Sequence, residues 1–484
     1  MSEQTGRIRR NFLFSFLSQF IRMITSFLLF IGIARVYGPE AFGQFTAAHA
    51  LSTIFILVAD FGFDTLLTSK LSRRQEQIGE LFRIYFSTKI VFAVFATCLM
   101  IATALVQTVS PATKELMYIF SFYVFFSSLT NFFFALFRSL EKFHHETRIF
   151  LWMNLLLLGS AAIFGFLKAS LVVITIAFVA SRLIGLAMAL ATASKLVDLS
   201  RLQLVRIRKS ELVVIAVFGF QAIFATLFFT QDTILLSWWT NDQAVGIYQA
   251  VFKIVGFTLL AAEIISLSLI PVLSRLHENE IGTWRVLNEL LHKTLLYVGS
   301  ILGLVAIVFA EPLISLLYGM NSYGDAVSIL RVFGCTIVIR HLCESSAAAL
   351  TSSQRQHVRL YVVASATIIN FVLNVFIIPR YGVMGAAFVS LFTNIFVSLG
   401  YTVGAGSDSL RLFLNWKIYL IPLASASLGF IIWSANWNDT LIALPFAVVA
   451  LIVTTFAIGF SKKERSYILS FKGLMSGAVS RNGS

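Results

Sequence analysis

The stretch NFLFSFLSQFIRMITSFLLFIGIARVYGPEAFGQFTAAHALSTIFILVADFGFDTLLT, residues 11–68, decides the fold class of this chain. Two apolar runs, 11–36 and 44–68, stand on either side of the short turn Tyr37–Gly43. A helix needs roughly 20 mostly apolar residues to cross the ~30 Å hydrocarbon core of a bilayer at ~1.5 Å per residue. Both runs meet this length, so the stretch is typical of a transmembrane helical hairpin.

The same alternation of long apolar runs and short polar connections continues along nearly the whole chain of 484 residues. Hydrophobic residues make up 58% of the sequence and charged residues only 12%, whereas ordinary soluble domains carry ~25% charged residues. We therefore predict an all-α polytopic membrane protein with about 14 transmembrane helices. The predicted spans are 11–36, 44–68, 85–108, 116–137, 149–167, 171–193, 212–238, 245–272, 291–318, 326–350, 359–379, 383–403, 415–434 and 440–460.

The formal net charge of +14 could indicate a nucleic-acid partner, so the positions of the charges decide its meaning. Of the 37 Lys and Arg residues, 27 lie in the terminal segments and in every second loop. The loops of the opposite set carry only Lys114, Lys168 and Arg380. Such an excess marks the cytoplasmic side of a membrane. The pattern predicts that both termini are cytoplasmic and that the basic residues meet anionic membrane lipids, and it argues against nucleic acid as a partner.

Cofactor and metal chemistry have no support in the sequence. Cys98, Cys335 and Cys343 all fall within predicted spans, and no residues show the spacing of metal ligands. We interpret these cysteines as small apolar packing residues. The phosphate-binding patterns GxxxxGKS and GxxxxGKT do not occur, so ATP hydrolysis by this chain is not expected. No cofactor and no metal are predicted.

A weak internal repeat divides the chain. The segment GPEAFGQFTA, 38–47, enters the second span as NDQAVGIYQA, 241–250, enters the eighth, at an offset of 203 residues. The tripeptide AFV occurs at 177–179 and again at 387–389, at an offset of 210. Six spans per copy is an even number, which predicts two six-helix lobes related by a pseudo-two-fold axis along the membrane normal. The predicted parts are an N-terminal lobe, 1–200, a C-terminal lobe, 201–410, and an appended helix pair with a cytoplasmic tail, 411–484.

Basic side chains inside predicted spans are candidate substrate-binding residues, because each charge costs at least ~2.5–3.5 kcal/mol to insert unless it meets a partner or water. Arg22 and Lys253 each lie about ten residues into a helix, ~15 Å deep, and neither has an acidic residue at i±3 or i±4. An anionic ligand would satisfy both charges, and the planar guanidinium of arginine suits phosphate. Further candidates are Arg182, Arg331 and Arg340.

Acidic side chains within the spans suggest ion coupling. Asp60 and Asp64 share one face of a predicted helix, where burial and mutual repulsion favour binding of a proton. Asp232 and Glu263 are similarly placed for a proton or a cation. An ion pair with a basic residue of another span explains each acid equally well.

Other intramembrane charges have simpler structural explanations. Arg340 and Glu344 are spaced i, i+4 on one helix face and fit a structural ion pair as well as a transport role. Lys89 lies near the inner end of its span, where a long side chain can extend to the interface.

Four motifs in a consistent order resemble polysaccharide exporters of the oligosaccharide flippase family, which belongs to the multidrug, oligosaccharidyl-lipid and polysaccharide exporter superfamily. ARVYGPEAFG, 34–43, is similar to the first external turn of that family, and ADFGFD, 59–64, to a later part of its second span. DTILL, 232–236, followed by AVGIY, 244–248, resembles the passage from the seventh to the eighth span. IPRYGVMGAA, 378–387, resembles the turn between the eleventh and twelfth spans.

The resemblance implies a defined task. Relatives move polyprenyl-diphosphate-linked oligosaccharide repeat units, as for O-antigen, capsule or exopolysaccharide, from the cytoplasmic to the outer leaflet. It implies alternating access through a cationic central cavity, location in a bacterial cytoplasmic (inner) membrane, and glycan polymerase and chain-length machinery as partners. Arg22 falls in the first-helix region where such flippases place cavity arginines.

Two other functions compete with this interpretation. An ion-coupled multidrug or other small-molecule exporter of the same superfamily would favour an acidic and aromatic site, which Arg22 and Lys253 do not suit. A membrane-embedded glycan polymerase or ligase would need catalytic groups at the outer surface, where this chain offers only short loops. We therefore do not expect an enzyme.

Overall fold

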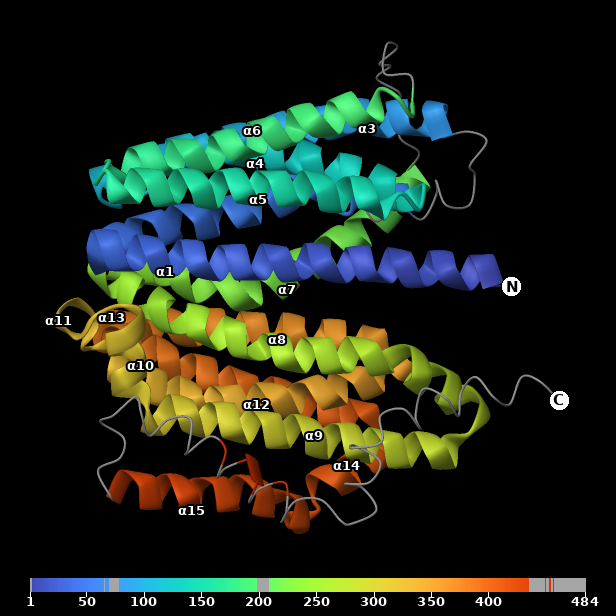
Figure 1. Cartoon of the computed structure of the whole chain (residues 1–484), viewed down its shortest axis with the longest axis vertical. Coiled ribbons are helices and arrows are strands. Elements are labelled where there is room, and N and C mark those ends of the chain that lie inside the picture. Colours follow the sequence, from blue (N-terminus) through green and yellow to red (C-terminus); the bar gives the residue numbers. More distant parts are fainter. Residues whose placement is uncertain are drawn as a thin grey trace. The chain divides into compact units, whose positions relative to one another are not determined.

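The computed structural model describes residues 2–64, 66–68, 78–197 and 209–434, together with residues 449, 452, 453 and 456. Every regular element within these ranges is a helix, and Figure 1 shows most of them as long rods. The helices are α1 (Ser2–Asp60), α3 (Ile78–Val106), α4 (Pro111–Ser139), α5 (Phe143–Phe166), α6 (Leu171–Ala193), α7 (Lys209–Trp239), α8 (Asp242–Asn279), α9 (Ile281–Val308), α10 (Ala310–Leu317), α11 (Met320–Tyr323), α12 (Ala326–Ser352), α13 (Gln356–Ala405), α14 (Ser407–Phe413), a 3-10 helix (Trp416–Tyr419) and α15 (Leu420–Ser434).

Nine of the described helices are long and apolar enough to cross a membrane, or ten if the bent pair Ser407–Phe413 and Trp416–Ile431 forms one span. Two of the nine contain two helices that are joined across a break at a glycine. α1 breaks at Gly38, with φ 80°, and α13 at Gly382, with φ 54°, both within predicted outer turns. The prediction of an all-helical polytopic membrane protein is confirmed, whereas the predicted span 440–460 lies almost wholly outside the described residues.

Packing divides the chain into two compact units. Unit 1 comprises Met1–Ala250 and Asn374–Val383, and unit 2 comprises Val251–Leu373 and Met384–Ser484. Unit 1 therefore includes α7, which packs on α1. The two predicted lobes and their symmetry relation stay a prediction.

Unit 1 is organised around α4, which contacts α1, α3 and α6. Aromatic side chains explain this central position. Phe132 and Phe133 of α4 are fully buried and face Phe82 and Phe86 of α3, with ring centroids 5.1 to 5.9 Å apart. Aromatic rings bury a large apolar area and interact edge to face. α4 consequently holds Ser121, Ser128 and Thr130 in the interior of the unit.

Unit 2 is organised around the pair α9 and α12, which pack along each other. Small residues allow their backbones to approach closely. A Cβ atom added to Gly303 would lie 2.6 Å from the carbonyl oxygen of Gly334, and one added to Gly299 would lie 2.6 Å from Cβ of His341. This close packing fixes the polar face of α12 described below.

Two segments of the internal repeat cross within unit 1. A Cβ atom added to Gly43 would lie 1.7 Å from the carbonyl oxygen of Asp242, and one added to Gly246 would lie 1.8 Å from the carbonyl oxygen of Pro39. Each contact is the other displaced by 203 residues, which is the offset of the repeat. Reciprocal contacts of this kind are what a two-fold relation produces.

Candidate functional site

A buried ion-pair cluster joins three helices of unit 1. Lys89 of α3 is 0% exposed and contacts the carboxylates of Asp60 and Asp64, the latter at 3.3 Å. Ser128 of α4 donates a hydrogen bond to Asp60 at 3.0 Å. Two carboxylates and one ammonium leave a formal charge of one negative unit, which a proton or a monovalent cation would neutralise.

The surroundings of Lys89 differ from the expectation in two respects. The prediction that Lys89 extends to the interface is wrong, because its side chain is fully enclosed by its acidic partners and by the ring of Phe132, 5.8 Å away. α1 ends at Asp60, and positive φ angles at Phe61 and Gly62 interrupt the helix before Asp64. The two acids therefore do not share one continuous helix face. The alternative of an ion pair with another span is confirmed for both.

A second ion pair lies where α4 meets α5. Nε of Arg138 is 3.4 Å from Oε2 of Glu146, whose side chain is mostly buried. Arg22 of α1 is exposed, and its positive charge acts on the Glu146 carboxylate. Neither Arg138 nor Glu146 is a candidate from sequence alone, because both lie in a predicted cytoplasmic loop, where charged residues are ordinary.

Arg182 of α6 lies among aromatic side chains of unit 1. Its Cζ atom is 5.4 Å from the ring centroid of Tyr123 and 5.7 Å from that of Phe178. Its Nε atom is buried and has no hydrogen-bond partner among the described residues. Cation–π attraction therefore supports this guanidinium. His49 packs against the same two rings.

Asp232 of α7 is 4% exposed and is held by neutral donors. The hydroxyl of Tyr248 donates to Oδ2 at 2.7 Å, and Nδ2 of Asn374 donates to Oδ1 at 2.8 Å. These two hydrogen bonds orient the carboxylate, and the role of Asp232 in binding a coupling cation or proton stays a prediction. Glu263 of α8, in contrast, is exposed.

The remaining basic candidates belong to unit 2. Lys253 is half-buried on α8, and Arg331 is exposed near the start of α12. Arg340 donates from Nη1 to Oδ1 of Asn394 at 3.0 Å, a residue of α13. Pairing of Arg340 with Glu344, which share one face of α12, stays a prediction. A common role of these residues with Arg22 and Arg182 stays a prediction.

Hydrogen bonds tie the repeat crossing to α4. Ser110 Oγ donates to Oδ2 of Asp242 at 2.6 Å, and Thr113 Oγ1 donates to Oδ1 at 3.1 Å. An acidic side chain in the first turn of α8 is also favoured by the helix dipole. Sequence reasoning missed Asp242, although it lies within the repeated segment 241–250 that marked the crossing.

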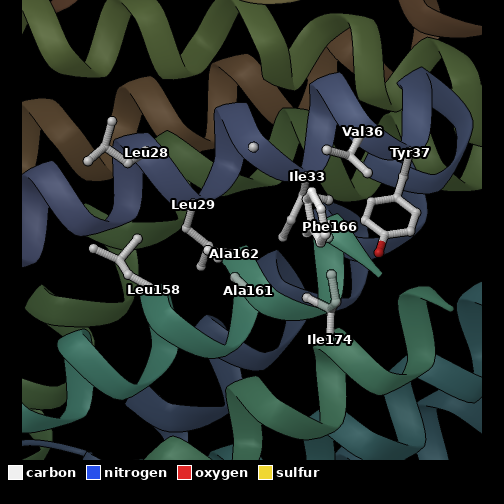
Figure 2. A pocket seen from close by; sticks show the side chains of 12 residues that line it. Leu28, Leu29, Ile33, Val36, Tyr37, Leu158, Ala161, Ala162, Phe166 and Ile174 are labelled. Carbon is white, nitrogen blue, oxygen red and sulfur yellow. The ribbon is translucent and has the colours of Figure 1, made fainter. Parts of the chain in front are cut away.

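A cavity of about 400 Å³ lies between α1, α5 and α6 in unit 1. Figure 2 shows that its walls are mainly apolar, with Leu29 and Ile33 on α1 and Leu158 and Phe166 on α5. Tyr37 lines one end and donates its hydroxyl to the carbonyl of Ala169 at 2.7 Å. No charged side chain lines this cavity, so it suits hydrocarbon and not an anionic headgroup.

Comparison with protein families gives two matches. The family described as polysaccharide biosynthesis protein matches residues 8–277, more than half of the chain. The family MatE matches residues 218–376. The chain is also 33% identical over 172 residues to the probable flippase AglR of Haloferax volcanii. That match covers 33% of this chain and 34% of the relative's length.

Solved structures share the fold. The lipid II flippase MurJ, in an inward closed conformation, matches with a TM-score of 0.72 and 15% identity, over 94% of this chain and 100% of that protein. An inward-facing multidrug resistance MATE family transporter of the MOP superfamily matches with a TM-score of 0.65 and 15% identity, over 80% and 94% of the two chains. At these identities the likeness concerns the fold alone.

Proposed function

Because the chain belongs to the polysaccharide biosynthesis protein family, we propose that it carries polyprenyl-diphosphate-linked oligosaccharide units from the cytoplasmic to the outer leaflet of the cytoplasmic membrane. The family is one of transporters and flippases, so the chain is a multi-pass membrane transporter and not an enzyme. Glycan polymerase and chain-length machinery would act on the delivered units.

The observation that carries the proposal is the presence of basic side chains within membrane-spanning helices. Arg22 and Lys253 lie in helices whose composition is otherwise strongly apolar. A diphosphate sugar cannot cross ~30 Å of hydrocarbon unaided, because desolvation of its charges is too costly. Guanidinium and ammonium groups can replace its hydration while the polyprenyl tail remains in the bilayer. Alternating access through a cationic cavity follows as the proposed mechanism.

Buried acids supply the proposed coupling to an ion gradient. Asp232, held by Tyr248 and Asn374, is one candidate. The cluster of Asp60, Asp64 and Lys89 is a second, since its residual negative charge favours a proton or a cation. An inside-negative potential would also assist outward movement of an anion, by ~2.3 kcal/mol per charge per 100 mV.

Cells that lack the protein test the proposal directly. We expect lipid-linked oligosaccharide to accumulate on the cytoplasmic face and wild-type protein to relieve the accumulation. Arg22→Ala and Lys253→Ala are expected to fold but to restore less than a tenth of the transport, since removing one charged contact costs ~1.5–3 kcal/mol. Arg285→Ala is the matched control, because Arg285 is exposed and pairs with Asp408 at the surface.

The result that would contradict the proposal is normal surface glycan in the deletion strain with no redundant exporter. The match to MatE over residues 218–376 then favours the second candidate, an ion-coupled exporter of small cationic molecules. Increased sensitivity of the deletion strain to cationic dyes would identify that activity. Normal glycan accompanied by unchanged dye sensitivity would exclude both.

A further inference from the structure

One face of α12 in unit 2 carries polar side chains at helical spacing. Arg340, Glu344 and Thr351 follow one another along this face, and Cys343 lies beside them. All four are half-buried. Charged side chains at membrane depth face protein or water and not hydrocarbon, because contact with lipid costs several kcal/mol. We call this surface the α12 polar face.

The second half of α13 fixes the deeper end of the α12 polar face. Asn394 accepts the hydrogen bond from Arg340 through Oδ1, while its Nδ2 donates to the carbonyl of Ser390 at 2.7 Å. This second bond sets the orientation of the amide, so that its oxygen is directed toward the guanidinium. Ser346 and Thr402, whose hydroxyls are 3.1 Å apart, hold the two helices together beside it.

A different set of neutral contacts fixes Arg359 at the other end of the α12 polar face, near the C-terminus of α12. Its Nη1 donates to Oγ1 of Thr351 at 2.8 Å, and its Cζ lies 5.8 Å from the ring centroid of Tyr401. Tyr401 is only 5% exposed, so its ring supports the guanidinium and is not itself available to a ligand. No carboxylate among the described residues forms an ion pair with Arg359. Its charge is therefore positioned without being neutralised.

Arg340 and Arg359 lie too far apart to bind the same group. Arg340 and Thr351 are eleven residues apart on α12, which corresponds to ~16 Å along the helix axis. A single phosphate or carboxylate group cannot contact both guanidinium groups over that distance. Each guanidinium presents several N–H donors in a planar fork, the arrangement that binds such oxyanions in pairs of hydrogen bonds.

We propose that the α12 polar face is a binding subsite in which Arg359 and then Arg340 hold an oxyanion of the transported molecule. This inference rests on the proposed function. It adds a contact between the transported molecule and unit 2, and it names the chemical group that is bound there. The oxyanion is a phosphate of the lipid-linked diphosphate or a carboxylate of an acidic sugar. Thr351, Tyr401 and Asn394 are positioning residues.

Cys343 provides a reporter that does not depend on transport. In the full chain with Cys98→Ser and Cys335→Ser, Cys343 is the one remaining thiol. We would measure its rate of reaction, in lipid nanodiscs, with an anionic and a cationic methanethiosulfonate, each normalised to the rate with free thiol. We expect the normalised rate to be about tenfold higher for the anionic reagent, because the positive charges of Arg340 and Arg359 concentrate anions near the thiol.

Variants test whether the two arginines cause the preference of Cys343 for the anionic reagent. Arg340→Gln and Arg359→Gln are each expected to lower the preference at least threefold, and Glu344→Gln is expected to raise it. Arg355→Gln is the matched control, because Arg355 is exposed and lies one helical turn before Arg359, so the preference should not change. Equal normalised rates in the parent protein, or a thiol that reacts only after denaturation, would overturn the proposal even if transport is normal.

Protection of Cys343 by small anions distinguishes the two sources. Protection by pyrophosphate but not by glucuronate would assign the subsite to the diphosphate, and the reverse would assign it to an acidic sugar. Each result should disappear in Arg340→Gln. Failure of both anions to slow the reaction at millimolar concentration would overturn the assignment of an oxyanion. Normal surface glycan in the deletion strain, together with intact protection of Cys343, would count against the proposed function alone.

Discussion

Gly246→Ala is expected to lower the melting temperature of the purified protein sharply, whereas Gly256→Ala is expected to maintain or raise it. The added Cβ at Gly246 would lie 1.8 Å from the carbonyl oxygen of Pro39, and only separation of the two backbones can relieve this overlap. We expect a cost at or above the upper end of the ~1–3 kcal/mol typical of overpacking. Gly256, in the same helix, has nothing within 4 Å of its added Cβ, so alanine there gains up to ~1 kcal/mol of helix propensity.

Gly43, the position that corresponds to Gly246 in the other copy of the repeat, provides a second test. Gly43→Ala should destabilise to a similar extent, because its added Cβ would lie 1.7 Å from the carbonyl oxygen of Asp242. The double variant Gly43→Ala/Gly246→Ala should cost less than the sum of the single changes, since one separation accommodates both methyl groups. The melting transition is followed by size-exclusion chromatography of detergent-solubilised protein after heating. Equal melting temperatures for Gly246→Ala and Gly256→Ala would show that the crossing is not this close.

Sequence could predict the crossing residues but not the crossing itself. The segments 38–47 and 241–250 were recognised as copies because they share alanine and glycine at corresponding positions. Similarity between two copies does not state that they touch. Their contact depends on carbonyl groups, at Pro39 and Asp242, which have no side-chain signature. The helix breaks were easier to predict, because Gly38 and Gly382 lie in short polar turns between apolar runs.

The partners of buried charged residues could not be predicted from hydropathy along the chain. Hydropathy gives the depth of Lys89 along its helix but not the helices that surround it, and its partner Asp60 is 29 residues away. Depth near an inner end therefore suggested extension to the interface, whereas the aromatic packing of α4 against α3 enclosed the side chain. Arg340 is a similar case. Its neighbour at i+4 was visible, but Asn394, at a distance of 54 residues, was not.

Lys89→Met is expected to destabilise the protein by ~3–5 kcal/mol, because it removes one partner of a buried ion pair and leaves two carboxylates uncompensated. The side chain is fully buried and the contacts to Asp60 and Asp64 come from a different helix, so no local rearrangement can replace it. Lys293→Met is the matched control. Lys293 pairs with Glu289 at 2.9 Å on a more exposed part of α9, where loss of the pair should cost at most ~1 kcal/mol.

Neutralising the whole cluster separates its structural role from ion coupling. The triple variant Asp60→Asn/Asp64→Asn/Lys89→Met should recover most of the stability lost in Lys89→Met, since it leaves no unpaired buried charge. Ser128 can still donate to the amide oxygen at position 60. If the cluster couples transport to an ion, the triple variant should fold, as judged by its melting temperature, yet lose the dependence of transport on the ion gradient. A stable triple variant that transports with unchanged dependence would make the cluster purely structural and would leave Asp232 as the coupling candidate. Persistent instability of the triple variant would contradict the assignment of the cost to uncompensated charge.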